Sequence, residues 1–224
     1  RIALETEQLH PEVRFNLNGQ KLSAGAQLYE HPIIIDSSVV IQSAIFVDDS
    51  IRERPSVKEI EFHRAIGKKG TLKYQPQRNY YGKGVLSLTD GIRGTSDFRD
   101  GYWLGFQEDD MVFSLNMDQP VPIHEISFSF LQNVGAWILL PESIHVEIFD
   151  TEMNLVADTV LLPETMPEVA GTLIDDYKTT FDGISASVIR ITAENPATLP
   201  SWHPYAGKRS WIFTDEIMVK QEQD

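Results

Sequence analysis

The sequence predicts an all-β fold built as β-sandwiches, and three observations support this prediction. Short runs of alternating or β-branched residues recur along the 224 residues. Turn-forming pairs such as Asp90-Gly91 and Asp182-Gly183, together with several prolines, separate these runs. No segment of about twelve residues or more has the apolar spacing of an amphipathic helix. Many short strands at fairly regular spacing are typical of sandwiches.

The expected strands can be given in chain order. The first one alternates and meets Asn18-Gly19, which is a hairpin signal between strand patterns. The later ones are rich in β-branched and aromatic residues. The predicted strands cover residues 13–17, 33–35, 39–47, 57–62, 111–117, 126–131, 144–149, 155–162, 188–193 and 210–220.

Composition limits the classes of function. Nineteen Lys and Arg against 33 Asp and Glu give a net charge of −14, which disfavours binding to nucleic-acid phosphates. Hydrophobic residues make up 42% of the chain, enough to bury a core. No run approaches the roughly 18 apolar residues that span a bilayer, so membrane insertion is not expected. The absence of cysteine removes disulfides, thiolate nucleophiles and cysteine-bound metals.

A domain boundary is expected near Gly67-Lys68-Lys69-Gly70, a basic, glycine-flanked patch between two series of strands. This boundary divides the chain into residues 1–66 and 67–224. The sequence also opens at Arg1 in the middle of a pattern, without a signal peptide. We therefore expect a fragment or processed form whose targeting signal lies outside the sequence.

The motifs of common enzymes are missing. The sequence has no phosphate-binding G-x-x-x-x-G-K-[ST], no G-x-S-x-G and no H-E-x-x-H, and its six histidines lack metal-ligand spacing. The adjacent carboxylates of Asp215 and Glu216 would point to opposite faces of a strand. They could not easily flank one scissile bond as glycosidase carboxylates do. We expect this chain to be non-catalytic.

Two features suit a binding module. The polar loop from Leu88 to Thr95 holds an Asp-Gly turn, which is either an ordinary turn or part of a calcium site built from loop oxygens. Tryptophans outside the alternating pattern either stack on sugars or pack in the core. Core packing is expected for Trp103 and Trp211, while both interpretations stay open for Trp137 and Trp202.

The second region resembles a known fold. Residues from about 70 to 220 are similar to the discoidin-type jelly roll, also called coagulation factor 5/8 type C, which family 32 carbohydrate-binding modules share. The resemblance rests on the order and spacing of Leu88-Thr89-Asp90-Gly91, Trp103-Leu104-Gly105-Phe106, Ile126 to Gln132, Trp137 to Pro141, Val188 to Ala193 and Trp211 to Ile217.

The first region resembles a small immunoglobulin-like domain. Such domains follow the catalytic barrel in bacterial β-N-acetylhexosaminidases and chitobiases. The matching residues are Val13 to Gly19 and Gln27-Leu28-Tyr29-Glu30-His31-Pro32-Ile33, with Asn18 in place of the usual Asp. The order of the two modules resembles the C-terminal end of exported family 20 hexosaminidases of Bacteroidetes. The same pair of modules also occurs in other glycosidases, including fucosidases.

The resemblance implies a structural calcium ion that joins the Asp-Gly loop to the last strand. Asp90 and Glu216 would supply carboxylates, and Thr95 its hydroxyl and carbonyl oxygens. Backbone oxygens of Ser87, Ile92 and Asp215 would complete the set. The ion would stabilise the fold and take no part in chemistry.

The resemblance also implies a glycan ligand, with galactose or a hexosamine as the expected sugar. By position and chemistry the expected binding residues are Trp202 and His203, followed by Asp97, Arg99 and Trp137. The expected function is a non-catalytic carbohydrate-binding end of an exported glycoside hydrolase, whose catalytic barrel would be a partner in the same chain. The expected location is the periplasm or outer membrane of a Gram-negative bacterium.

The same fold admits two alternative functions. A structural spacer would bind nothing and would bury Trp137 and Trp202 against neighbouring domains. Membrane recognition, as in blood-clotting relatives of the fold, needs apolar loop tips and basic rims. The net charge of −14 makes that second function a poor match.

Overall fold

The computed structural model describes residues 1–164 and 171–221 and confirms the all-β fold class. Within the described residues, the only helices are three short 3-10 turns. The chain divides into two compact units, Arg1–Phe62 and His63–Asp224. The predicted boundary between residues 66 and 67 lies close to this division, and each unit is described by itself. No helix in the described ranges is long and apolar enough to cross a membrane.

The first unit is an antiparallel sheet in the order β2-β1-β3-β4, with β5 also paired to β3. Its strands are β1 (Glu12–Leu17), β2 (Gln27–Leu28), β3 (Val39–Val47), β4 (Ser50–Ile51) and β5 (Ser56–Ile60). Alternation buries Val13 and Phe15 of β1 on one face. A small cluster of Leu22, Ala26, Ala44 and Phe46 packs in this unit.

This unit differs from the expected sandwich in two details. Residues 1–62 form one sheet, whereas an immunoglobulin-like sandwich has two facing sheets. The predicted strand 33–35 is reduced to an isolated bridge between Ile2 and Ile33, and the side chain of Ile34 is exposed. An apolar run of three residues is too short to secure a ladder of its own.

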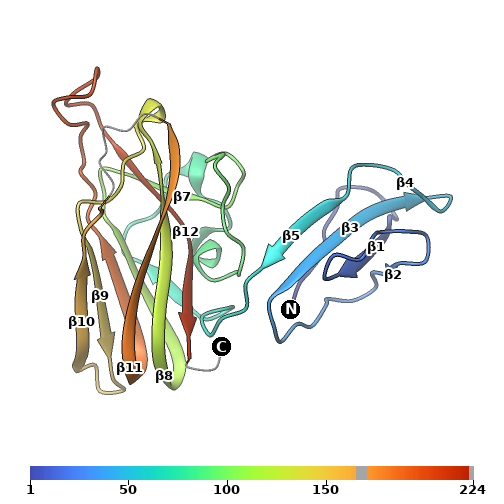
Figure 1. Cartoon of the computed structure of the whole chain (residues 1–224), viewed down its shortest axis with the longest axis horizontal. Helices are drawn as coiled ribbons and strands as arrows, with labels where there is room; N and C mark the ends of the chain where they lie inside the picture. Colours follow the sequence, from blue (N-terminus) through green and yellow to red (C-terminus); the bar gives the residue numbers. More distant parts are fainter. Residues whose placement is uncertain (165–170, 222–224) are drawn as a thin grey trace. The chain divides into compact units, whose positions relative to one another are not determined.

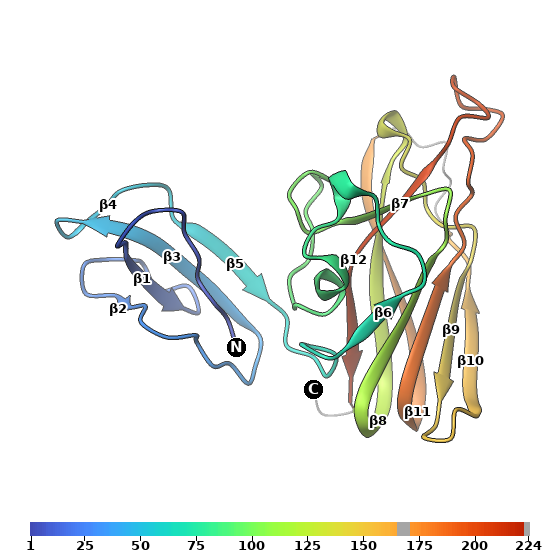
Figure 2. The same cartoon turned by 180° about the vertical axis from the view of Figure 1, so that it is seen from behind.

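The second unit contains seven paired strands in the order β10-β9-β11-β8-β12-β7, with β6 beside β8. Its elements in chain order are β6 (Gly70–Leu72), η1 (Arg78–Tyr80), η2 (Gly84–Leu88), β7 (Leu104–Gln107), β8 (Met111–Asn133), η3 (Val134–Ala136), β9 (Ile144–Phe149), β10 (Leu155–Leu161), β11 (Thr172–Ala193) and β12 (Trp211–Lys220). Figures 1 and 2 show these strands stacked as a two-layered sandwich.

The two long strands β8 and β11 take part in both layers of this sandwich. Residues 188–193 of β11 pair with β9 and with the first part of β8, whereas residues 172–180 pair with the second part of β8, which in turn pairs with β12. Register shifts separate the halves, and Asp118 and Gly183 near these shifts have positive φ angles of 62° and 64°. Figure 2 shows both strands turning at the same end of the unit. The predicted turn at Asp182-Gly183 is therefore a bend inside β11.

The core lies between the layers and is lined by alternate residues of the strands. Phe106, Phe113, Phe128 and Ile189 are almost fully buried there. Strand β12 is buried along nearly its whole length because it lies between β7 and β8. Its polar residues Asp215 and Glu216 are therefore buried and need hydrogen-bond partners.

One end of the sandwich is formed by two connecting segments. Residues 134–143 join β8 to β9, and residues 194–210 join β11 to β12. Figure 1 shows both at the upper end of the unit, opposite the β9–β10 turn. Connections at the end of a rigid sandwich are common positions for binding residues.

Candidate functional site

Four aromatic side chains meet at this loop end, and we call them the end cluster: Trp137, Trp202, His203 and Tyr205. The ring centroids of Trp137 and Tyr205 are 5.5 Å apart, and those of His203 and Tyr205 are 6.0 Å apart. Trp202 lies 5.8 Å from His203 by the same measure. His203 is buried, the tryptophans are half-buried, and Tyr205 is 57% exposed. The buried His203 thus lies at the bottom of the cluster, whereas the rings of Trp137, Trp202 and Tyr205 have accessible faces.

The position of Trp137 is fixed by the short helix η3. The Asn133 side chain accepts a hydrogen bond from the Ala136 N–H at 3.1 Å and caps this turn. Trp137 then takes a left-handed conformation with φ at 67°, which costs a non-glycine residue about 1 kcal/mol. Glycine would adopt this conformation without strain, yet the position holds a tryptophan. Because backbone strain concentrates at functional sites, this suggests a functional role for Trp137.

His203 connects the two loop segments. Its Nδ1 accepts the backbone N–H of Tyr205 at 3.1 Å, so Nδ1 carries no hydrogen. The hydrogen is then on Nε2, which lies 3.2 Å from the carbonyl oxygen of Val134 and donates to it. His203 thus joins the 194–210 segment to η3, beside Trp137.

The base of the second segment is held by Asn195, which is 7% exposed. Its side-chain nitrogen donates to the carbonyl oxygens of Phe106 and Asp109, at 3.2 and 3.1 Å. Its side-chain oxygen accepts from the N–H of Ala197 and the hydroxyl of Ser210. One amide therefore fixes both ends of the loop that carries Trp202 and Tyr205.

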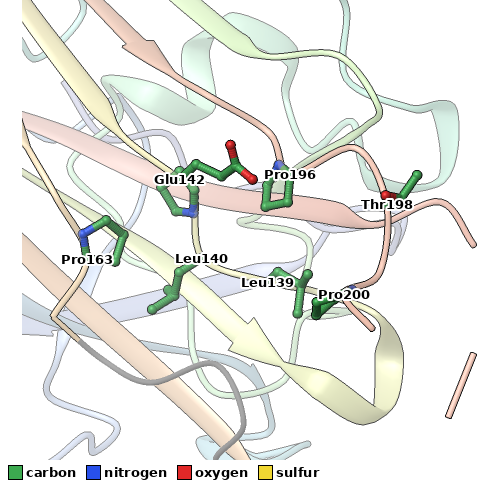
Figure 3. A pocket seen from close by; sticks show the side chains of 8 residues that line it. Leu139, Leu140, Glu142, Pro163, Pro196, Thr198 and Pro200 are labelled. Atoms are coloured by element: carbon green, nitrogen blue, oxygen red, sulfur yellow. The ribbon is translucent and has the colours of Figure 1, made fainter. Parts of the chain in front are cut away.

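A cavity of about 400 Å³ lies between the same two segments. Figure 3 shows side chains that line it, among them Leu139, Leu140, Pro196 and Pro200; Glu142 contributes a carboxylate. The remaining lining residues are Pro141, Pro163 and Thr198. Two of its lining residues are close in sequence to the end cluster, since Leu139 follows Trp137 by two residues and Pro200 precedes Trp202 by two.

A second aromatic group, which we call the aromatic pocket, lies around Tyr80, Phe98, Trp211 and Phe213. It has a cavity of about 160 Å³ that Ala136 and Ile138 also line. The predicted binding residues Asp97 and Arg99 lie on this side, both exposed. The Arg99 guanidinium lies 4.8 Å above the Phe98 ring, and the Asp97 carboxylate accepts the backbone N–H of Arg99. Trp211, expected in the core, is half-buried at this pocket, whereas Trp103 is in the core as expected.

The six residues predicted to bind calcium lie in or beside a different arrangement, which we call the acidic staple: Asp90, Asp215 and Glu216 with their donors. Glu216 Oε2 accepts the N–H groups of Asp90 and Gly91 at 3.1 and 3.0 Å. Glu216 Oε1 lies 2.9 Å from Nε2 of His63. The staple thereby joins the Asp-Gly loop to β12 through N–H donors, where the sequence predicts a metal ion.

The other two carboxylates are engaged in the same way. Asp215 accepts from the hydroxyl of Ser129 and from the Gly94 N–H, the latter at 2.8 Å. Asp90 accepts from the Ile92 N–H at 3.0 Å and from the Lys83 ammonium at 2.9 Å. All six carboxylate oxygens of the staple thus face a protein donor.

Burial sets the electrostatics of this staple. Desolvation raises the pKa of Glu216 well above its usual range, and the nearby carboxylates of Asp90 and Asp215 raise it further. Desolvation also raises the pKa of Asp215, against the lowering effect of the Ser129 hydrogen bond. Keeping these groups ionised is therefore costly unless donors compensate each oxygen.

The predicted ligands do not fit a calcium ion in this arrangement. Calcium takes six to eight oxygens, yet the carboxylate oxygens already face N–H or O–H groups, and the Lys83 ammonium adds positive charge. Of the other predicted ligand atoms, the Thr95 carbonyl oxygen accepts the Trp103 indole N–H. Among the described residues, no group of three or more His, Cys, Asp or Glu could hold a metal ion.

The structure thus brings together Trp137, Trp202 and His203 of the predicted glycan residues and places Asp97 and Arg99 at the aromatic pocket. Sequence reasoning missed Tyr205 as a member of the cluster and Asn195 as its support. The Pro200-x-x-x-Pro204 frame could have pointed to Tyr205, because strand pairing cannot continue there. Nothing in the sequence pointed to Asn195, since its partners come from distant segments.

Comparison with known proteins gives structural neighbours only. No family model and no curated protein matches the chain. A Streptococcus pneumoniae fucose-binding module is 13% identical, with 72% of this chain and 96% of that chain covered, at a TM-score of 0.48. The lectin domain of lectinolysin, in complex with Lewis B antigen, is 14% identical over 72% of this chain and 97% of its own, at a TM-score of 0.47.

A third neighbour is CpGH89CBM32-4 of Clostridium perfringens, in complex with GlcNAc-α-1,4-galactose. It is 14% identical, with 70% of this chain and 92% of that chain covered, at a TM-score of 0.43. Such identities are too low to transfer the roles of individual residues, so each role that we assign rests on the contacts within this chain.

Proposed function

We propose that residues 63–224 form a non-catalytic carbohydrate-binding module whose binding face is the end cluster. One observation carries the proposal: Trp137, Trp202 and Tyr205 come from two separate connections and gather at one end of a rigid sandwich, with their rings partly accessible. Aromatic rings outside a core, held by polar contacts, are suited to a ligand with an apolar face.

The chemistry of a sugar fits this surface. The C–H face of a pyranose ring can stack on an indole or phenol ring, and its hydroxyls need directional partners. The neighbouring cavity supplies the carboxylate of Glu142 and the hydroxyl of Thr198 among apolar walls. We propose that one sugar unit stacks on the end cluster and that an adjoining unit extends toward this cavity.

The carboxylates of the staple support a binding role over a catalytic one. Asp215 and Glu216 are 0% and 1% exposed, and both oxygens of each accept hydrogen bonds from the protein. A general acid or base must reach the substrate within hydrogen-bond distance. These two buried groups are therefore structural in our proposal.

The wider setting is proposed from the sequence resemblance. The two units would form the C-terminal end of an exported family 20 β-N-acetylhexosaminidase, acting in the periplasm or at the outer membrane. The first unit would be a spacer beside the catalytic barrel. The module would hold the enzyme near its glycan, and bound galactose or hexosamine units would raise the local substrate concentration.

The test is glycan binding measured by titration calorimetry on the 224-residue chain. The panel contains galactose, N-acetylglucosamine and fucose, the last being named with the pneumococcal neighbour. We expect Trp137→Ala and Trp202→Ala each to weaken binding about 10- to 100-fold, as loss of an aromatic anchor does. Leu155→Ala is the control, because Leu155 is 52% exposed at the opposite end of the sandwich.

Two results would contradict the proposal. Glycan binding that survives both tryptophan substitutions would show that the site lies elsewhere. The aromatic pocket would then be the next candidate. A chain that binds no glycan on a broad array would favour the spacer function instead. The accessible faces of the end cluster would then have to be covered by another domain.

A further inference from the structure

We infer that the acidic staple is completed by the protein alone: His63 and Lys83 supply the donors and positive charge that a divalent cation would otherwise bring. The inference concerns the stability of the module and does not depend on the proposed function.

His63 directs a ring hydrogen at Glu216. The backbone N–H of Ala65 donates to Nδ1 of His63 at 3.2 Å, so Nδ1 has no hydrogen of its own. Nε2 then carries the hydrogen and donates it to Glu216 Oε1. Both side chains are fully buried. This N–H takes up one of the lone-pair directions of the Glu216 Oε1 oxygen.

Lys83 contacts the staple at Asp90. Its ammonium lies 2.9 Å from Asp90 Oδ2, and its backbone N–H donates to the Ser87 hydroxyl at 2.8 Å. Lys83 thereby engages the carboxylate of Asp90, one of the predicted calcium ligands. An ammonium at this distance also repels a divalent cation at the same carboxylate.

The negative charge of the staple has to be balanced by hydrogen-bond donors and positive charge. Three carboxylates lie together, and those of Asp215 and Glu216 are buried. Five uncharged groups donate to these two buried carboxylates, from His63, Ser129, Asp90, Gly91 and Gly94. The Lys83 ammonium adds a full positive charge at Asp90. Donors on every oxygen are what a buried carboxylate needs in place of a metal.

The test compares thermal unfolding of the 224-residue chain in EDTA and in millimolar calcium chloride, and measures calcium binding directly by titration calorimetry. We expect equal midpoints and no binding heat. A calcium site would raise the midpoint by several degrees, because a ligand that binds only the folded state stabilises it by mass action. Such a rise, or saturable binding heat, would overturn the inference.

A pair of lysine substitutions tests the role of Lys83. Lys68 forms a similar ion pair with Asp118, also at 2.9 Å, but the Asp118 side chain is 55% exposed whereas that of Asp90 is 17% exposed. We expect Lys83→Met to lower the midpoint in EDTA by more than Lys68→Met does. Equal changes of the midpoint would mean that the Lys83 ammonium stabilises the protein no more than a surface ion pair does. This result would contradict the role of Lys83 in the staple.

Discussion

The ring of Tyr205 lies 5.5 Å from the ring of Trp137, centroid to centroid, at an interplanar angle of 46°. The two residues come from different connections, so their contact depends on both loops having their native conformation. The Trp137 backbone is strained, whereas Tyr205 is largely exposed. The pair therefore presents a preorganised surface, which lowers the entropic cost of binding a ligand.

The first prediction concerns Tyr205. Tyr205→Ala should weaken glycan binding about 10-fold or more, because an exposed aromatic anchor is lost. Its free energy of unfolding should change by no more than about 0.5 kcal/mol, since the side chain is 57% exposed. Tyr205→Phe should keep most of the affinity if the ring face is the binding element. Titration calorimetry and urea unfolding measure the two quantities, and an unchanged affinity in Tyr205→Ala would remove Tyr205 from the site.

The second prediction concerns the support of the loop. Asn195→Ala removes four side-chain hydrogen bonds at a 7% exposed position and leaves buried carbonyl groups without partners. The free energy of unfolding should fall by about 2–3 kcal/mol. Glycan affinity should fall as well, because Trp202 and Tyr205 lose their fixed positions.

The control for Asn195→Ala is Asn154→Ala. Asn154 also donates a side-chain hydrogen bond, to Asp150, but it is exposed at the opposite end of the sandwich. Asn154→Ala should change the free energy of unfolding and the glycan affinity only slightly. Loss of stability without loss of affinity in Asn195→Ala would show that the loop positions its rings independently of this amide.

The third prediction concerns the close approach of Gly94 to Trp103. A Cβ atom at position 94 would lie 2.3 Å from the Trp103 ring, and that tryptophan is 1% exposed and bonded to the Thr95 carbonyl. Gly94→Ala should therefore lower the free energy of unfolding by about 1–3 kcal/mol through overpacking. Gly135→Ala is the control, since its Cβ would meet nothing closer than 3.6 Å. Denaturant unfolding that finds the two variants equally stable would contradict this packing argument.

The sequence predicts the strands well where alternation and β-branching are strong, as in 144–149 and 188–193. It misses residues 172–187 of β11, because the charged and polar residues between Thr172 and Thr180 interrupt the apolar pattern, and Asp182-Gly183 at the bend has the composition of a turn. The Asp182-Gly183 pair predicts a turn between strands. The positive φ of Gly183 does mark a change of direction there, but the ladder continues past it.

The candidate site is predictable to a similar extent. Proline spacing and position outside the strands indicate Trp202 and His203, and these two residues do lie with Trp137. The calcium prediction assumes that clustered oxygens are free to ligate. Whether they are free depends on donors such as His63 and Ser129, which are distant in sequence from Asp215 and Glu216. No local pattern could pair them, so the calcium ion stays a prediction that this arrangement does not favour.

The fourth prediction concerns where the second unit begins. The sequence places the boundary after residue 66, but His63 donates to Glu216, Arg64 donates its N–H to the Val219 carbonyl, and Ala65 is fully buried. A fragment of residues 67–224 should therefore be less stable than a fragment of residues 61–224 by about 3 kcal/mol, because Glu216 loses a buried partner. The substitution His63→Ala in the longer fragment separates this effect from the loss of Ala65 and should account for most of it. Urea unfolding of the three proteins measures the differences. Equal stability of the two fragments would show that the second unit begins where the sequence places it and that Glu216 does not need His63.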